Sequence, residues 1–143
     1  MQIYLAKTAG FCFGVDRAVS LVEQAIRDGK RAVTLGPIIH NRHVVERFAR
    51  LGVREIASPD EAQPGETVIL RAHGVEKAMQ EELAARGLEV IDATCPFVTK
   101  IHKIVEKESA KGQTIIIIGD AKHPEIIGIH GHCSSKCYIV NSA

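Results

Sequence analysis

Short apolar runs rich in β-branched residues alternate along this chain with longer segments of helical period. The runs span residues 3–6, 32–35, 53–56, 67–70, 88–91, 114–118 and 137–140, and the longest helical segments span 14–29, 41–52, 75–87 and 96–112. Buried parallel strands have this apolar composition, and helices commonly join one parallel strand to the next. The alternation therefore predicts an α/β fold of parallel sheets flanked by helices on both faces.

Signals at the segment ends agree with this pattern. Asn41 is typical of a helix N-cap, Pro96 suits a first helical turn, and Gly29 ends its segment as C-cap glycines do. Residues 58–67 are polar and rich in proline and glycine, which predicts a surface loop with at most one helical turn. The last long helical segment carries an apolar stripe of helical spacing, namely Phe97, Ile101, Ile104 and Val105.

Composition limits the possible functions. The chain has 143 residues, 45% of them hydrophobic and 24% charged, which is enough for one domain with a core. A formal charge of +1, with both signs interspersed, argues against binding to nucleic acid or to an anionic membrane. No apolar run is long enough for a membrane span or a signal peptide, so we expect a cytoplasmic protein. Its four cysteines are then expected to be buried thiols, metal ligands or redox groups, not disulfides.

Five cysteine and histidine residues lie at the same kind of place, between a predicted strand and the next helix. They are Cys12, His40, His73, Cys95 and His123. In a parallel sheet such junctions lie together at the carboxyl ends of the strands, where open α/β folds bind ligands. Helix N-termini at that edge favour anions and thiolates. We therefore expect one crevice that can bind an anion beside a thiolate-bound metal.

Glu125 lies near the start of a short predicted helix beside the same crevice. A carboxylate there complements the helix dipole, and a carboxyl group desolvated beside a metal and a substrate can also act as a proton donor. The sequence leaves both interpretations open. The remaining histidines are expected to be solvated or packed, and they are His43, His102, His130 and His132.

Two kinds of metal site are compatible with the cysteines. Cys12 and Cys95 are isolated from each other in sequence, which suits an iron–sulfur cluster that collects its ligands from several loops. The segment "HGHCSSKC" offers four candidate zinc ligands, which are His130, His132, Cys133 and Cys137. Adjacent His132 and Cys133 are awkwardly placed to reach one ion, which argues against this zinc site.

Five longer motifs, in their order and spacing, resemble one known family. They are "GFCFGVDRAV", "HNRHVV", "AHGV", "DATCPFVTK" and "HPEIIGI". They are similar to motifs of the 4-hydroxy-3-methylbut-2-enyl diphosphate reductases, the last enzymes of the non-mevalonate isoprenoid pathway. The resemblance covers nearly the whole chain and about the first half of the family's usual length. It implies a trefoil of three α/β lobes, with residues 1–94 as the first lobe and residues 95–143 as the start of the second.

The resemblance also implies ligand roles. Cys12 and Cys95 match two of the three cysteines that hold a [4Fe–4S] cluster, and the third belongs to the later part of the family's chain. His40, His73 and His123 match the histidines that bind the substrate's diphosphate. A chain with these residues alone would hold only part of the family's site.

Glu125 matches the acidic residue that relays protons to the substrate. The implied reaction uses two electrons and two protons to expel the allylic hydroxyl group as water, which yields isopentenyl or dimethylallyl diphosphate. The implied partners are this small diphosphate substrate and an electron donor such as ferredoxin or flavodoxin. Two other classes stay open on the residues alone: a non-catalytic α/β module that binds an anion or metal at the same loops, and a zinc hydrolase.

Overall fold

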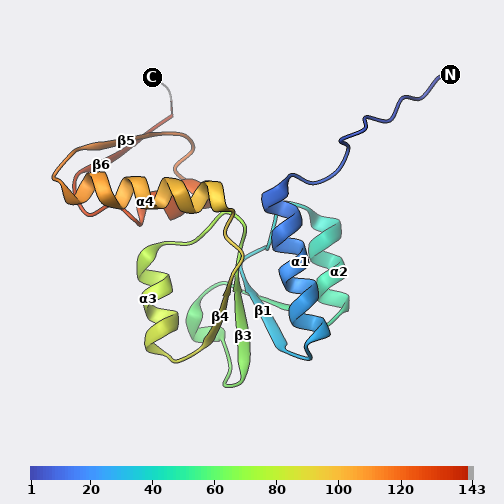
Figure 1. Cartoon of the computed structure of the whole chain (residues 1–143). Coiled ribbons are helices and arrows are strands. Elements are labelled where there is room, and N and C mark those ends of the chain that lie inside the picture. Colours follow the sequence, from blue (N-terminus) through green and yellow to red (C-terminus); the bar gives the residue numbers. More distant parts are fainter. Residues whose placement is uncertain (142–143) are drawn as a thin grey trace.

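The computed structural model describes residues 1–141 and contains two parallel sheets (Figure 1). The larger sheet has the strand order β2-β1-β3-β4 and is built from β1 (Arg31–Leu35), β2 (Arg54–Ile56), β3 (Glu66–Leu70) and β4 (Glu89–Asp92). The smaller sheet pairs β5 (Ile115–Ile118) with β6 (Cys137–Val140). The predicted α/β class with parallel sheets is confirmed. The lobe boundary between residues 94 and 95 falls between β4 and the next helix, and it stays a prediction.

Helices cover both faces of the larger sheet (Figure 1). One face carries α1 (Phe13–Arg27) and α2 (Arg42–Arg50), and the other carries α3 (Lys77–Ala85). Strand β3 contributes to both cores because successive side chains point to opposite faces. Ile69 packs with the cluster of α1 and α2, whereas Val68 and Leu70 pack with Leu83 of α3.

The smaller sheet packs with α4 (Pro96–Ala110) and α5 (Pro124–His130). Val105, Ile117 and Ile129 form its buried cluster, one residue from each of α4, β5 and α5. This core is smaller than the two cores of the larger sheet. Among residues 1–141, no helix is long and apolar enough to cross a bilayer.

The predicted element ends are confirmed where a capping group sets them. The side chain of Asn41 accepts a hydrogen bond from the backbone N–H of Val44 at 3.2 Å, which fixes the start of α2. Gly29 follows α1 with a φ of 71°, a conformation that glycine adopts without strain. The polar loop at residues 58–67 contains a single 3₁₀ turn, Pro59–Glu61.

The strand expected at residues 3–6 is wrong. Ile3, Tyr4 and Leu5 are 81%, 86% and 86% exposed, and the segment leads away from α1 without joining a sheet (Figure 1). β-Branched and aromatic residues form a strand only where a neighbouring strand offers hydrogen bonds and a surface to pack on. The described part of the chain places no strand beside this segment.

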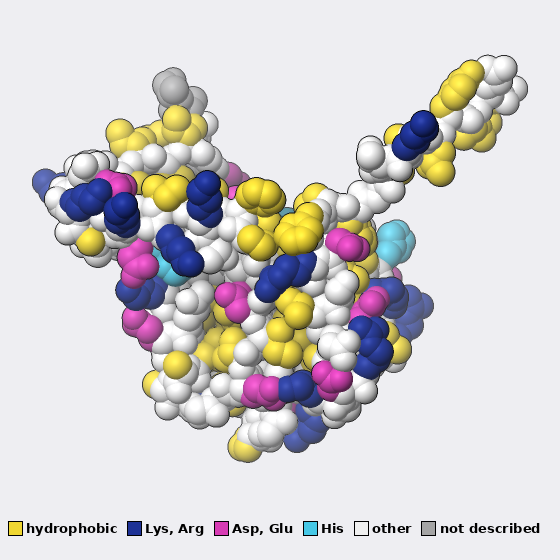
Figure 2. Space-filling view, viewed as in Figure 1, with side chains coloured by type: hydrophobic (Ala, Val, Ile, Leu, Met, Phe, Trp, Pro, Cys, Tyr) yellow, Lys and Arg dark blue, Asp and Glu magenta, His cyan; other side chains and the backbone are white. Residues whose placement is uncertain are grey.

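Of the predicted apolar stripe on α4, Val105 is buried in the core, whereas Ile101 is 39% exposed. Phe97 and Ile104 are 70% and 51% exposed, while the buried side of α4 is Val98, His102, Val105 and Ser109. Packing against α5 and the loop after β3 decides which side turns inward. Figure 2 shows hydrophobic side chains on the surface where the starts of α1 and α4 meet.

Candidate functional site

The carboxyl ends of the strands carry the predicted site residues. His40 lies between β1 and α2, His73 follows β3, Cys95 lies between β4 and α4, and His123 lies between β5 and α5. These four junctions are as predicted. Cys12 directly precedes α1 as its N-cap, but no strand leads to it.

The three predicted histidines come together although they arise from separate loops. The ring centroids of His40 and His73 are 4.2 Å apart, and His123 lies 5.6 Å from His40 and 5.9 Å from His73. Three imidazoles at this spacing can reach the same small anion. The convergence of strand ends that the sequence predicted therefore holds for this group.

His73 is the electrostatic centre of the cluster. Burial of its ring, aided by the positive charge that His40, His123 and Arg71 can carry, lowers the pKa of His73 to about 4. The imidazole is therefore neutral near neutral pH. Its Nδ1 atom is buried and has no hydrogen-bond partner among the described residues.

His123 is fixed by its own helix. Its Nδ1 accepts a hydrogen bond of 3.2 Å from the backbone N–H of Glu125, so the neutral ring carries its proton on Nε2. Glu125 is partly buried in the first turn of α5. This position is compatible both with a charge that complements the helix dipole and with a proton donor beside the cluster.

Arg71 was not singled out from the sequence, although an arginine directly after a buried strand is a usable signal. Its Nε donates to the carbonyl oxygen of Gly74 at 3.1 Å, which holds the turn that follows His73. A Cβ at Gly36 would lie 2.8 Å from the Nη1 atom of Arg71, so the guanidinium also packs against the loop after β1. Arg71 thereby joins the loops that carry His40 and His73.

The two candidate cluster ligands lie at helix N-termini that approach each other. Cys12 is the N-cap of α1 and is exposed, whereas Cys95 is the N-cap of α4 and is partly buried. Neither side chain makes a capping hydrogen bond. A Cβ at Gly14 would lie 2.5 Å from the Sγ atom of Cys95, so only glycine allows this contact. Both thiols are available as soft ligands for iron.

The two thiols do not complete a ligand set. Within residues 1–141, no group of three or more Cys, His, Asp or Glu side chains is placed to hold a metal ion. The chemistry of Cys12 and Cys95 fits an iron–sulfur cluster, but their number leaves at least one ligand to be supplied from elsewhere. The zinc hydrolase hypothesis lacks a zinc site in this part of the chain.

The candidate zinc segment at residues 130–137 is contradicted by its geometry. The Nε2 atom of His132 lies 3.2 Å from the carbonyl oxygen of Val75, and its ring stacks on His102 at 4.1 Å. Cys133 points to the carbonyl oxygen of Ser135. Burial, together with the neighbouring Cys133, raises the pKa of Cys137 to about 11, which is the behaviour of a packed thiol.

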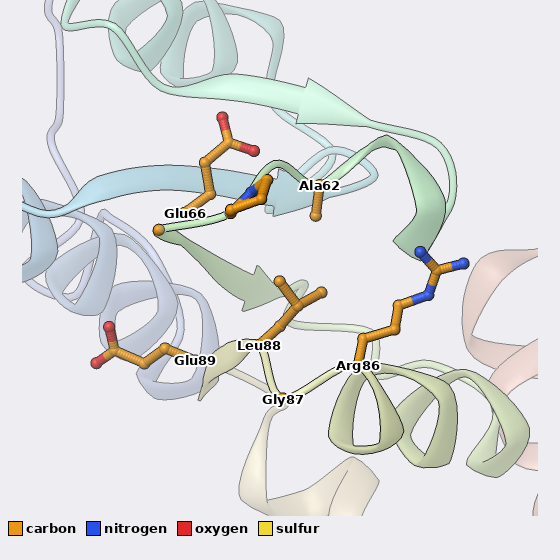
Figure 3. A pocket seen from close by; sticks show the side chains of 8 residues that line it. Ala62, Glu66, Arg86, Gly87, Leu88 and Glu89 are labelled. Atoms are coloured by element: carbon orange, nitrogen blue, oxygen red, sulfur yellow. The ribbon is translucent and has the colours of Figure 1, made fainter.

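The cavities at the base of the larger sheet are separate from these residues. One of about 590 Å³ lies where β3 and β4 begin, opposite the carboxyl ends, and is lined by Glu66, Arg86, Leu88 and Glu89 among others (Figure 3). At the site's own edge, a groove of about 490 Å³ is lined by Arg17, Asp92, Thr94, Pro96, Thr99, Lys100 and Lys103. Thr94 and Pro96, on either side of Cys95, place this groove next to that cysteine, and Arg17 is another lining residue that the sequence did not single out.

Comparison with known proteins relates the chain to one family. The family model described as "LytB protein" matches residues 3–143. The 4-hydroxy-3-methylbut-2-enyl diphosphate reductase of a Thermoanaerobacter species is 47% identical over 146 aligned residues, which cover 99% of this chain and 51% of the relative. The Citrifermentans bemidjiense reductase is 46% identical over 142 residues, with 99% and 50% covered.

Two solved structures have the same fold. The structure of an (E)-4-hydroxy-3-methyl-but-2-enyl diphosphate reductase superposes with a TM-score of 0.83 at 42% identity, over 98% of this chain and 51% of that one. The Plasmodium falciparum E-1-hydroxy-2-methyl-but-2-enyl-4-diphosphate reductase gives 0.90 at 32% identity, over 96% and 44%. The chain spans about half the length of the relatives that it matches. Because the family model covers nearly all of its residues, the chain belongs to the LytB protein family.

Proposed function

We propose that this chain carries the diphosphate-binding histidines and two of the cluster cysteines of a 4-hydroxy-3-methylbut-2-enyl diphosphate reductase. The observation that carries the proposal is the meeting of three histidine rings from separate loops, all within 5.9 Å of one another. Packing of the fold does not require three imidazole rings to lie together, whereas binding of a small anion by all three does. The relatives with this printed activity share 46–47% of the aligned residues.

Each histidine would contribute a different group to the diphosphate. His40 is exposed and can approach from solvent, while His123 presents its Nε2–H because Nδ1 already accepts from the backbone. His73 is neutral, and its buried Nδ1 has no hydrogen-bond partner within residues 1–141. A bound anion would favour the imidazolium form of His73, because the anion's charge compensates the burial that lowers its pKa.

Cys12 and Cys95 would bind two irons of a [4Fe–4S] cluster, with the third cysteine in the part of the relatives' length that this chain does not span. When bound, the cluster would supply electrons and a Lewis-acidic iron for the substrate's hydroxyl group. Exposed Cys12 and partly buried Cys95 are both reachable during assembly of such a cluster. A small redox protein such as ferredoxin or flavodoxin would be the electron donor.

The proposed reaction breaks the allylic C–O bond and forms a C–H bond. Two electrons and two protons enter, the hydroxyl group leaves as water, and isopentenyl or dimethylallyl diphosphate remains. Glu125 would deliver a proton, since it is partly buried beside His123 in the first turn of α5. The diphosphate held by the histidines would keep the reacting carbon at a fixed distance from Glu125.

Isothermal titration of this chain with inorganic pyrophosphate tests the proposal. We expect binding that weakens about tenfold or more in His40→Gln, His73→Gln and His123→Gln, because each variant loses an anion contact. His43→Gln is the matched control, since His43 is exposed on α2 outside the cluster. Equal weakening in the control, or no binding by the unchanged chain, would contradict the proposed site.

One observation favours a second candidate, a non-catalytic module that binds an anion at the same loops. The described residues do not assemble a group of three metal ligands. Anaerobic reconstitution with iron and sulfide, followed by absorption and electron paramagnetic resonance spectroscopy, separates the candidates. A cluster signal that depends on Cys12 and Cys95 supports the reductase, whereas pyrophosphate binding without any cluster signal supports the module.

A further inference from the structure

Arg17 joins the two segments that carry the cysteines. It lies in the second turn of α1, after the N-cap Cys12, and its guanidinium reaches the end of β4. Its Nη1 donates to the carbonyl oxygen of Thr94 at 3.2 Å, and its Nη2 donates to that of Asp92 at 3.1 Å. The planar guanidinium presents several donors in a rigid fork, which lets one side chain hold two carbonyls at once.

The rest of the Cys95 segment is held from the opposite side. The backbone N–H of Cys95 donates to the carbonyl oxygen of Ala72 at 2.9 Å, and that of Ala93 donates to Leu70 at 3.2 Å. These bonds attach the segment to the end of β3 but not to α1. In the described part of the chain, the two bonds from Arg17 are the hydrogen bonds that join α1 to residues 92–95.

Packing limits the approach of the cysteines but does not fix their alignment. The contact between Gly14 and the Sγ atom of Cys95 sets how closely α1 can come. Dispersion contacts are non-directional, so the helix could still slide or turn against the segment. The two hydrogen bonds from Arg17 are directional, and one of them ends at Thr94, the residue directly before Cys95, while the other ends at Asp92.

We infer that Arg17 is a positioning residue that holds Cys95 in register with Cys12, so that both thiols reach one iron–sulfur group. The inference rests on the proposed function, because it takes the two cysteines as ligands of the same group. It assigns Arg17 no contact with substrate. A lysine at this position would offer one ammonium group in place of the fork, and would therefore restore the alignment only in part.

Chemical cross-linking of the intact chain tests the inference. In a Cys133→Ala/Cys137→Ala background only Cys12 and Cys95 remain as thiols. A bis-maleimide with a rigid phenylene spacer then bridges them or modifies each separately. Mass spectrometry distinguishes the products, because the bridged chain gains one reagent and the separately modified chain gains two. The bridged fraction reports how well the thiols are aligned, since the second reaction is intramolecular.

We expect the bridged product to dominate in the background chain. Arg17→Gln should lower its yield about fivefold, and Arg17→Lys should recover part of the loss, because intramolecular reaction depends on geometry. Arg27→Gln is the matched control, since Arg27 lies on the same helix and, within residues 1–141, its guanidinium pairs with Glu23 and Gln24 of that helix. Circular dichroism melting of each variant ensures that the comparison is made well below unfolding.

The outcomes distinguish failure of the positioning role of Arg17 from failure of the proposed function. A folded Arg17→Gln chain that bridges as well as the background chain overturns the positioning role and leaves the proposed function intact. A similar loss in Arg27→Gln also overturns it, because the effect would then belong to helix α1 in general. Failure of the background chain itself to bridge overturns both the positioning role and the assignment of the two cysteines to one cluster.

Discussion

The Sγ atom of Cys95 fills the space that a side chain at Gly14 would need. A Cβ at Gly14 would lie 2.5 Å from that sulfur and 3.0 Å from the Cβ of Cys95. Gly14 is inside helix α1, where alanine is normally favoured over glycine. The contact with Cys95 therefore outweighs local helix propensity at this position.

Gly14→Ala should destabilise the chain by about 1–3 kcal/mol, because the added methyl group must displace Cys95 or α1. Urea unfolding followed by circular dichroism measures the loss. Gly128→Ala is the control, since it is also helical but its Cβ would lie 3.5 Å from the nearest atom, Nε2 of His102, which is ordinary contact. A Gly14→Ala chain as stable as the control would contradict the close contact.

His102 should make the stability of the fold depend on pH. Burial and the stacked His132 lower the pKa of His102 to about 4 from 6.5, while Asp92 acts weakly in the opposite direction. The unfolded chain then binds more protons than the folded chain between these pKa values. The free energy of unfolding is therefore unaffected by protonation of His102 above about pH 6.5. It falls by up to about 3 kcal/mol as the pH drops towards 4.

Urea unfolding at a series of pH values checks this dependence. The unchanged chain should lose stability on acidification, and His102→Gln should lose clearly less because the buried titrating group is gone. His43→Gln should retain the full loss, since His43 is exposed on α2. Parallel curves for His102→Gln and the unchanged chain would show that another group is responsible.

Arg71→Met should raise the pKa of His73. Burial is the main cause of the low pKa of His73, and the charge of Arg71 adds to it after His40 and His123. Removal of that charge therefore moves the pKa upward while leaving it below 6.5. Titration of the His73 ring signals by nuclear magnetic resonance measures the change. Arg50→Met, at an exposed position of α2, is expected to leave the titration unchanged, and an unshifted Arg71→Met curve would exclude the influence of Arg71.

Glu66 should stabilise the base of the larger sheet, at the cavity shown in Figure 3. Its carboxylate is 7% exposed, accepts from Arg54 at 2.9 Å and from the backbone N–H of Gln63 at 2.8 Å. Burial opposes ionisation, but the hydrogen bonds from Gln63 and Arg54 outweigh it and lower the pKa of Glu66 below its usual value. Glu66→Gln should cost about 1–3 kcal/mol near neutral pH, because a charge-assisted pair is lost in a buried place.

The stability contribution of Glu66 should disappear in acid. Since the folded pKa of Glu66 is lowered, its contribution is present above the ordinary pKa and is lost as the pH falls through the folded value. The unfolding free energies of Glu66→Gln and the unchanged chain should therefore converge in acid. Glu89 lines the same cavity as Glu66, but it is exposed, pairs with Lys30 and accepts a hydrogen bond from Thr67 at 2.7 Å, so Glu89→Gln should have a much smaller effect at every pH.

Short-range signals were sufficient for much of the fold. The apolar runs from residue 32 to residue 140 became strands, Asn41 and Gly29 ended their helices as predicted, and His40, His73 and His123 met because parallel strands share one carboxyl edge. Each of these features depends on residues close in sequence or on a rule common to all parallel sheets. Such features can be predicted without coordinates.

Other features depended on partners that a sequence does not name. Residues 3–6 have strand composition but no strand beside them in the described part of the chain, and α4 turns Phe97 outward because α5 and the Gly74 turn pack on its other side. The contact of Gly14 with Cys95 and the reach of Arg17 to the end of β4 join positions far apart in the chain. The sequence alone determined which edge of the sheet carries the reactive side chains. Only tertiary packing decided their distances, because helix rotation and strand pairing are set by contacts between segments and not by periodicity within them.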